Sequence, residues 1–524
     1  MRLTRTAALA ALLSTTFLMP ALAADLTIGR ASEQSSIDPQ FSRTGNNQMT
    51  STMFFDRLVN FDENLQVSPG LAESWTNEDD TTWTLKLREG VTFHDGSPFT
   101  AADVVYSLER ADEVPNSPAP YTDMVSSVAG VEAVDDLTVK ITTNVPNPAL
   151  MEDIGRVFII SKAAAEGKTS EDFNAPATAV GTGPYILDEW RVGETLTMHA
   201  NEAYWGTVPE FNEVEIRYIS NDAARVAALL SGAVDVIDAV PPQDVARLDG
   251  TDGINVFSTP SGRVIYLGLS MRGDQAPAVT DLSGNPLEEN PFKDARVRKA
   301  ISLMIDRQLI VDRILGGSGV PAGQLVPDAL GGHNPDVAPD AVDVEQAKAL
   351  LAEAGYPDGF GLTLYSSNDR FPGDADIVQA LGQMLARGGL KVNGVEALPY
   401  SVYSKAASAG DYGAFVFSLG SSTPTSAPNL QALLGTYDKE AGKGAFNRVR
   451  FSSEAFDAAL ADALQEFDAE ARLTKLRDAT ALVFEETPIV PLYWQKVHWG
   501  LKDGLTIDAG LSEQTLPQKI TSTE

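Results

Sequence analysis

Cysteine is absent from this chain of 524 residues, and histidine occurs only four times. Without cysteine, no disulfide stabilises the fold, no thiol acts as a nucleophile and no thioether-linked lipid can be attached. The histidines, His94, His199, His333 and His498, are widely separated in sequence, which argues against a multi-histidine metal site. We therefore expect no metal and no cofactor.

The common catalytic motifs are missing too. The chain has no Gly-x-Ser-x-Gly elbow, no His-Glu-x-x-His helix and no Gly-x-x-x-x-Gly-Lys-Ser/Thr phosphate loop. His94 and Asp95 are neighbours, but adjacent residues on a turn seldom converge on one point, so a structural role is favoured for both. We expect no catalytic residue.

Basic residues are scarce, with 39 Lys and Arg against 72 Asp and Glu and a net charge of -33. Nucleic acid is excluded as a partner on this ground, because its binding requires a basic surface. The acids are scattered along the chain, which favours a role in solubility, with steering of cationic ligands as the alternative.

Long apolar runs are missing except at the start of the chain. Arg2 and Arg5 precede an apolar run from Ala7 to Leu18, and Ala21 and Ala23 are the small residues that a signal peptidase reads. The run is shorter than the roughly 20 residues that span a bilayer. Residues 1–23 are therefore predicted to be a cleaved signal peptide, and we expect a periplasmic protein without a lipid anchor.

The length predicts two or three lobes, because single hydrophobic cores stop growing at roughly 250 to 300 residues. Strand-like and helix-like segments alternate, which favours an α/β fold with mixed sheets. The patterns predict strands over 82–88 and 234–237, and helices over 222–231, 294–309, 343–354 and, as a pair, 453–485. Asp222, Asp294 and Asp343 are the predicted helix caps.

Several different motifs follow one another along the chain. They are Leu71-Ala-Glu-Ser-Trp75, Thr82-Trp-Thr-Leu-Lys-Leu-Arg-Glu-Gly-Val-Thr-Phe-His-Asp-Gly96, Pro98-Phe-Thr-Ala-Ala-Asp-Val-Val-Tyr-Ser107, Gly181-Thr-Gly-Pro-Tyr185, Asn201-Glu-Ala-Tyr-Trp205, Leu230-Ser-Gly-Ala-Val-Asp-Val236, Asp294-Ala-Arg-Val-Arg-Lys-Ala-Ile301 and Ile305-Asp-Arg307. Together they resemble the signature of periplasmic solute-binding protein family 5, the oligopeptide-, dipeptide- and nickel-binding proteins of ABC importers. The resemblance covers nearly the whole chain after the signal.

This resemblance implies a two-lobe periplasmic binding protein of type II, class C, with hinge crossovers and an extra domain. Lobe I would combine residues 24–57, 176–263 and 491–524. The extra domain would span 58–175, and lobe II would span 264–490.

The same resemblance suggests ligand-binding residues. Glu33, Gln34 and Ser35 follow the first strand, where relatives line the cleft, although an ordinary strand-end turn is the alternative. Arg370 resembles the arginine that holds a ligand carboxylate in dipeptide-binding relatives, and its planar fork suits that task. Phe371 beside it would supply an aromatic wall. A surface arginine in a turn is the alternative for Arg370.

The segment Phe417-Ser-Leu-Gly-Ser-Ser-Thr-Pro-Thr-Ser426 departs from the family pattern. Relatives that clamp a peptide's ammonium group carry a tryptophan near its start and an aspartate after its glycine, whereas Ser421 occupies the aspartate's place here. A hydroxyl does not neutralise a buried ammonium, so recognition of a free α-amino group is in doubt. Ser421, Ser422 and Thr423 are candidate hydrogen-bonding residues, and Trp494 is a candidate cleft residue.

The expected function is that of a periplasmic receptor that encloses a small peptide or peptide-like polar solute by hinge closure. Its partners would be the solute and an ABC permease of the inner membrane, and the protein would be a monomer. Alternative cargoes are an opine, a glutathione-like tripeptide, a sugar or a nickel complex. The alternative classes are a secreted hydrolase and a periplasmic chaperone.

Overall fold

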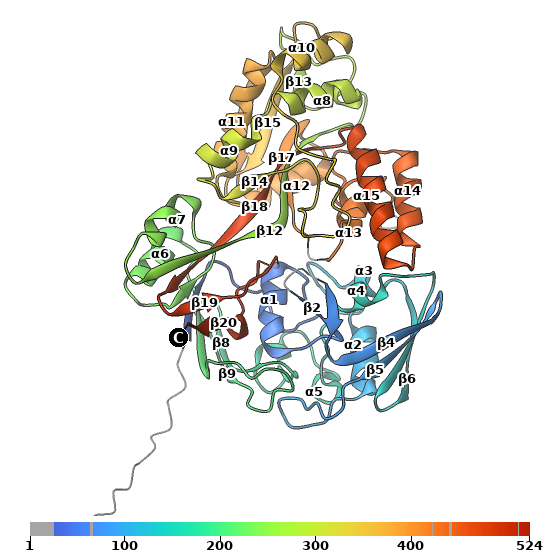
Figure 1. Cartoon of the computed structure of the whole chain (residues 1–524), viewed down its shortest axis with the longest axis vertical. Coiled ribbons are helices and arrows are strands. Elements are labelled where there is room, and N and C mark those ends of the chain that lie inside the picture. Colours follow the sequence, from blue (N-terminus) through green and yellow to red (C-terminus); the bar gives the residue numbers. More distant parts are fainter. Residues whose placement is uncertain (1–25, 63–65, 422, 440–442, 512, 524) are drawn as a thin grey trace, which may run out of the picture.

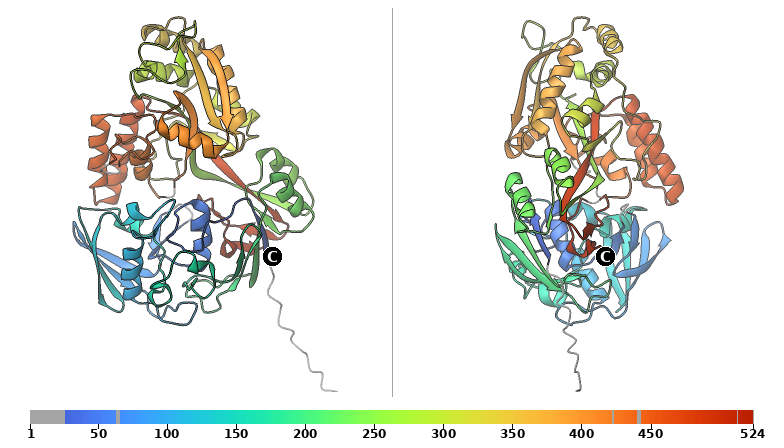
Figure 2. Two further views of the ribbon diagram at one scale, coloured as in Figure 1. Left: turned by 180° about the vertical axis from the view of Figure 1, so that it is seen from behind. Right: turned by 60° about the vertical axis from the view of Figure 1, so that its left-hand side comes forward.

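Two lobes, stacked one above the other in Figure 1, make up the molecule. The computed structural model describes residues 26–62, 66–421, 423–439, 443–511 and 513–523, so the predicted signal peptide and Ser422 lie outside the described residues. The lower lobe contains both the first strand and the C-terminal segment. The upper lobe is built mainly from the second half of the chain (Figures 1 and 2).

A sheet of twelve strands, counted over the described residues, runs through both lobes. Its lower-lobe strands are β8 (Tyr185–Arg191), β9 (Thr195–Ala200), β10 (Glu213–Tyr218), β1 (Leu26–Arg30) and β11 (Val236–Ile237). Its upper-lobe strands are β13 (Val279–Thr280), β14 (Gly319–Pro321), β15 (Gly361–Ser367), β16 (Lys391–Leu398) and β17 (Ala414–Leu419). The long strands β12 (Ile254–Leu269) and β18 (Val490–Lys502) connect the two groups. Parallel pairs, such as β1 with β10, and antiparallel pairs, such as β12 with β18, make the sheet mixed, as predicted.

A separate four-stranded antiparallel sheet lies in the lower lobe. It has the order β4 (Ala72–Asp79), β5 (Thr82–Leu87), β7 (Thr138–Thr143) and β6 (Val128–Asp135). The predicted alternation of β5 is confirmed, because Trp83, Leu85 and Leu87 are buried together in the hydrophobic cluster of this sheet. Two short ribbons complete the strands: β2 (Val59–Phe61) with β3 (Val67–Pro69), and β19 (Leu505–Ile507) with β20 (Ile520–Ser522).

Helices cover the sheets of both lobes. Those of the lower lobe are α1 (Gly45–Phe54), α2 (Ala101–Arg110), α3 (Thr122–Val125), α4 (Leu150–Ile154), α5 (Lys162–Ala165), α6 (Asp222–Leu230) and α7 (Pro242–Asp249). Those of the upper lobe are α8 (Ala295–Leu303), α9 (Arg307–Arg313), α10 (Val344–Glu353), α11 (Asp374–Arg387), α12 (Tyr400–Ala409), α13 (Ala427–Leu433), α14 (Glu454–Leu464) and α15 (Ala469–Glu485). None of the helices in the described ranges is long and apolar enough to cross a membrane.

Three of the predicted elements differ from the structure. The helix predicted over 294–309 is two helices, because the Asp306 side chain accepts a hydrogen bond from the Leu309 backbone and caps a new helix. Asn221, one residue before the predicted cap Asp222, caps α6. The strand predicted over 234–237 is paired only at Val236–Ile237. The caps Asp294 and Asp343 are confirmed.

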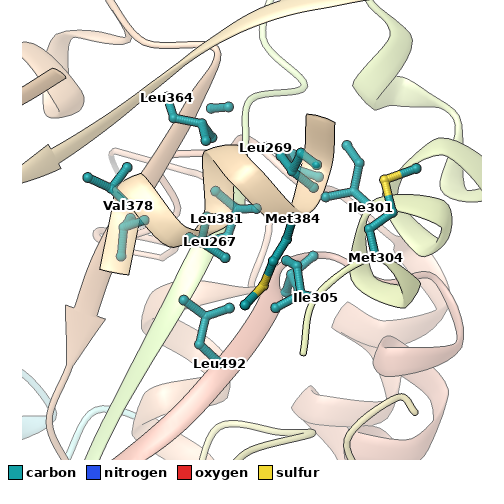
Figure 3. Close-up of a cluster of buried hydrophobic side chains, with 14 of the residues drawn as sticks. Leu267, Leu269, Ile301, Met304, Ile305, Leu364, Val378, Leu381, Met384 and Leu492 are labelled. Carbon is teal, nitrogen blue, oxygen red and sulfur yellow. The ribbon is translucent and has the colours of Figure 1, made fainter. Parts of the chain in front are cut away.

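The core of the upper lobe shows why α11 forms where it does. Asp374 and Asp376 lie in its first turn and Arg387 in its last, the charge order that favours a helix dipole. Its apolar side chains recur at helical spacing and are fully or almost fully buried. Figure 3 shows them packed against residues of β12, β15, β18 and the α8 region, namely Leu267, Leu269, Leu364, Leu492, Ile301, Met304 and Ile305.

Candidate functional site

The two long strands β12 and β18 carry the chain between the lobes, and their pairing is interrupted midway. Pro260 pairs with Lys496 and Val264 with Trp494, so residues 261–263 stand opposite Gln495 alone. At this interruption the Ser421 backbone N–H donates to the carbonyl of Gly262 at 2.9 Å. A strand ladder is weakest where it is interrupted, so the structure provides a bending point between the lobes.

An ion pair lies beside this bending point. The Arg263 guanidinium is 3.1 Å from a carboxylate oxygen of Glu513, which belongs to the C-terminal segment. Glu513 has a left-handed backbone with φ of 60°, a conformation that a non-glycine residue adopts only when its surroundings hold it there. The pair therefore links a crossing strand to the lower lobe next to the hinge.

The predicted residues Glu33 and Ser35 make contacts at the end of β1. The Glu33 carboxylate accepts hydrogen bonds from the Trp190 indole at 2.7 Å and from the Gly193 backbone at 2.9 Å. The exposed Ser35 hydroxyl donates to the side-chain oxygen of Asn47 in α1 at 3.2 Å. Both residues thus brace the loop after β1, and Ser35 keeps a free surface.

Gln34 is buried and lies next to a buried cation. Its side-chain oxygen accepts hydrogen bonds from Thr50 at 3.2 Å and from Tyr218 at 2.8 Å, but its amide nitrogen has no partner in the described part of the chain. Arg30, the last residue of β1, bonds Thr50 at 3.1 Å while its Nε and Nη2 are also unpartnered. Burial lowers the pKa of Arg30, whereas the negative charge of Asp238 raises it.

Ser421 and Thr423 form the loop that follows β17 in the upper lobe. Both are buried, and the Ser421 hydroxyl contacts the Thr423 carbonyl at 3.3 Å. Thr423 donates to the carbonyl of Thr425 at 3.0 Å. Asn429 on α13 is also buried, and its amide nitrogen has no partner among the described residues. No carboxylate stands in the described part of 417–426, so this loop presents hydroxyl and amide groups.

Trp494 and Gln495 lie on β18 where it leaves the interruption. Trp494 is buried in an upper-lobe cluster, with its ring centroid 6.0 Å from that of His333. The indole Nε1 of Trp494 and the side-chain oxygen of Gln495 are buried without partners in the described residues. A large majority of buried polar groups are hydrogen-bonded, so these two atoms call for a ligand or ordered water.

Arg370 and Phe371 begin the turn before α11. Arg370 is exposed, and its guanidinium carbon is 5.2 Å from the centroid of the Tyr400 ring. Phe371 is buried in the core cluster of the upper lobe, together with Ile377 and Leu315. Arg370 is therefore exposed beside the Tyr400 ring, whereas Phe371 is buried in the core and does not supply the aromatic wall predicted for it.

The structure brings together one group that the sequence interpretation missed. Arg57 follows α1, Arg156 follows α4, and Tyr121 precedes α3. Arg57 forms an antiparallel bridge with Phe158 and stacks on that ring at 4.1 Å, which places it near Arg156 two residues away. Burial lowers the pKa of Arg57 to about 10, and the charge of Arg156 acts in the same direction. No motif marks this group, because its members lie up to a hundred residues apart.

The lobes also touch at the edge opposite the hinge strands, where α14 and α15 stand over α3 and α4 (Figure 1). Arg472 of α15 is 3.7 Å from the carboxylate of Glu152 in α4. Phe467 packs against the hydrophobic cluster of the four-stranded sheet, and Phe61 packs against a cluster of the upper lobe. The lobes are thus joined by the hinge strands on one side and by this contact on the other.

His94 has a structural role, as the sequence interpretation favoured. One ring nitrogen is 3.1 Å from the carbonyl of Gly183, and the other accepts from the Gly181 backbone at 3.3 Å. Asp95 instead accepts from Ser97 at 2.6 Å. Among the residues that the structure describes, no group of three or more His, Cys, Asp or Glu could hold a metal ion.

One protein-family model matches most of this chain. The family model described as bacterial extracellular solute-binding proteins, family 5, middle region, matches residues 66–441. That match covers well over half of the chain.

Individual relatives agree with this match. The glutathione-binding protein GsiB of Escherichia coli K12 is 28% identical over 483 residues, which are 91% of this chain and 90% of the relative. HbpA2 from Haemophilus parasuis is similar in structure, with a TM-score of 0.81 at 26% identity over 96% of this chain and 100% of that one. AgaA of Agrobacterium tumefaciens R10, solved with agropinic acid, has a TM-score of 0.74 at 26% identity over 96% of this chain and 99% of that one. The two-lobe fold of periplasmic binding proteins is confirmed.

Proposed function

Since this chain belongs to family 5 of the bacterial extracellular solute-binding proteins, we propose that its cargo is a small, oxygen-rich, peptide-like solute. The protein would bind this solute in the periplasm as a monomer without a lipid anchor, close around it, and deliver it to an ABC permease. It would act as a receptor and not as an enzyme. The relative named for glutathione and the relative solved with agropinic acid both support a solute of this size and polarity.

Unpartnered, buried N–H groups in both lobes carry the proposal. Gln34 supplies one such donor from the lower lobe, while Asn429 and Trp494 supply two from the upper lobe. An unmade hydrogen bond in a buried site costs about 1–3 kcal/mol, so a bound solute with carbonyl and carboxylate oxygens would relieve several such penalties at once. A peptide-like molecule provides these acceptors along its whole length.

The loop after β17 refines the proposal. Ser421 stands where peptide-clamping relatives are expected to carry an aspartate, and its hydroxyl is turned toward Thr423. An ammonium group placed there would lose its hydration without gaining a counter-charge. The solute would therefore not need a free α-amino group at this end.

The test has two steps. Native mass spectrometry of protein purified without denaturation should reveal the mass of a retained solute, and a mass matching an opine would replace the peptide-like cargo. Calorimetric titration with free and N-acetylated dipeptides should then give similar affinities within each pair. Much tighter binding of the free dipeptides would contradict the argument from Ser421.

A further inference from the structure

Arg57, Arg156 and Tyr121 lie together in the lower lobe, on segments that also contact the upper lobe, and present donors that the protein leaves unused. Arg57 Nε, Arg156 Nε, Arg156 Nη2 and the Tyr121 hydroxyl are all buried without a hydrogen-bond partner in the described part of the chain. Within that part, neither arginine has a carboxylate oxygen within 4 Å. We propose that this group, which we call the arginine pair site, binds a carboxylate of the solute.

The carboxylates near the site have partners of their own. Arg43, at the start of α1, belongs to the same surroundings, but it is already paired with Asp123 at 2.7 Å. Glu152 lies beside Arg156 and is engaged by Arg472 of the upper lobe. Asp153 accepts a hydrogen bond from Asn147 at 3.0 Å, and burial raises the pKa of its carboxyl to about 6. Asp56, whose charge also acts on Arg57, accepts hydrogen bonds from Thr182, Tyr204 and Trp205. No carboxylate of the described residues is therefore paired with Arg57 or Arg156, although Arg57 Nη2 donates to the Thr52 hydroxyl at 3.2 Å.

Tyr121 adds a neutral donor to the two cations. Its side chain is fully buried, and burial raises its pKa above the usual range, while the charges of Arg57, Arg43 and Arg156 act against that increase. The phenol therefore keeps its proton at neutral pH. A carboxylate accepts about four hydrogen bonds and pairs side-on with guanidinium forks, which matches this set of donors.

The two chain segments that hold the site both contact the upper lobe. Four residues after Arg57, Phe61 packs against an upper-lobe cluster. Four residues before Arg156, Glu152 pairs with Arg472. Arg57 and Arg156 are themselves only half-buried, whereas their unpartnered nitrogen atoms are buried.

This inference rests on the proposed function and deepens it, because it assigns an anionic end to the solute. Guanidinium groups with unused donors in a partly buried site are unfavourable. Water would satisfy the donors, whereas a carboxylate would also bring an opposite charge next to them. The solute class that fits is a peptide-like molecule whose carboxylate lies on the lower-lobe side, away from Arg370.

The test compares Arg156→Gln and Tyr121→Phe with wild type and with Arg191→Gln. Arg191 is an exposed lower-lobe arginine paired with Glu189, so its replacement removes the same charge far from the site. In calorimetry with glutathione, Arg156→Gln should weaken binding tenfold or more and Tyr121→Phe several-fold, while Arg191→Gln should bind like wild type. The monoethyl ester of the glycine carboxyl group should bind wild type and Arg156→Gln with more similar affinities.

A second probe separates this inference from the choice of cargo. If glutathione fails to bind wild type, sulfate should still raise the unfolding temperature of wild type and Arg191→Gln more than that of Arg156→Gln, at an ionic strength matched with chloride. That result would support the site and reject the peptide-like cargo. Equal glutathione affinities of wild type and Arg156→Gln, or equal sulfate shifts when glutathione does not bind, would overturn the inference. If circular dichroism shows that Arg156→Gln is unfolded, Tyr121→Phe decides, because it removes only one hydroxyl.

Discussion

We expect His498 to make the stability of this protein depend on pH through a strand of the hinge. It lies on β18, buried with 5% of its surface exposed, and its Nδ1 is 2.6 Å from the hydroxyl of Ser258 on β12. Its Nε2 has no partner in the described residues. Burial lowers the pKa of His498 from 6.5 to about 4, and the positive charge of Lys496 acts in the same direction.

The sign of the effect follows from proton binding. Between about pH 4 and 6.5 the unfolded chain protonates this histidine while the folded protein keeps it neutral. The contribution to stability is therefore fully present above about pH 6.5 and is lost as the pH falls toward 4. At about 1.4 kcal/mol per pKa unit, the loss is at most roughly 3 kcal/mol, and partial access of water reduces it.

The assay is urea unfolding of wild type, His498→Asn and His199→Asn at several pH values between about 4.5 and 7.5. His199 is a suitable control because it is a half-exposed histidine paired with Asp188. The free energy of unfolding of His498→Asn should vary less with pH than that of wild type, while His199→Asn should follow wild type closely. Identical pH dependences for wild type and His498→Asn would refute the reasoning.

Three further outcomes are expected. Arg472→Ala removes the mostly buried ion pair with Glu152 between the lobes. It should increase the radius of gyration in small-angle scattering and weaken solute binding several-fold, because the Glu152 carboxylate loses its partner. An unchanged radius would contradict the role of this contact. Ser421→Asp should raise the affinity for free dipeptides tenfold or more relative to their N-acetylated forms in calorimetry, and an unchanged ratio would place the amino end of the ligand elsewhere. Leu381→Ala leaves a cavity at a fully buried position (Figure 3) and should lower the free energy of unfolding in urea by about 2–5 kcal/mol. The Leu309 side chain is 38% exposed, so Leu309→Ala should lower it by less than about 1 kcal/mol. Equal losses would contradict the packing described.

Local features of the fold were the easiest to predict from the sequence. The caps Asp294 and Asp343 and the alternation in β5 depend on residues a few positions apart, so a short window of sequence contains them. The break between α8 and α9 was missed because the apolar spacing continues across it. Only the hydrogen bond that Asp306 accepts shows that a second helix begins there.

The candidate site was less predictable, because it depends on which distant segments meet. Arg57 and Arg156 become neighbours through the bridge between Arg57 and Phe158, and nothing near either residue in the sequence indicates that pairing. The resemblance led to Glu33 and Ser421 but not to this group, which no quoted motif contains. The roles of Glu33, Gln34, Ser35, Arg370 and Thr423 in ligand binding remain predictions.

The pairing of β12 with β18 limits how the two lobes can move. Two independent single-strand links would allow the lobes to shear and twist freely, but strands bonded to each other form a ribbon in which sliding breaks several ladder bonds at once. The ribbon resists stretching and yields where residues 261–263 are not paired with β18. The two lobes would therefore open and close mainly by changing one angle. Solute capture then depends on that angle, and the lobes do not need to find each other as they would on a flexible linker.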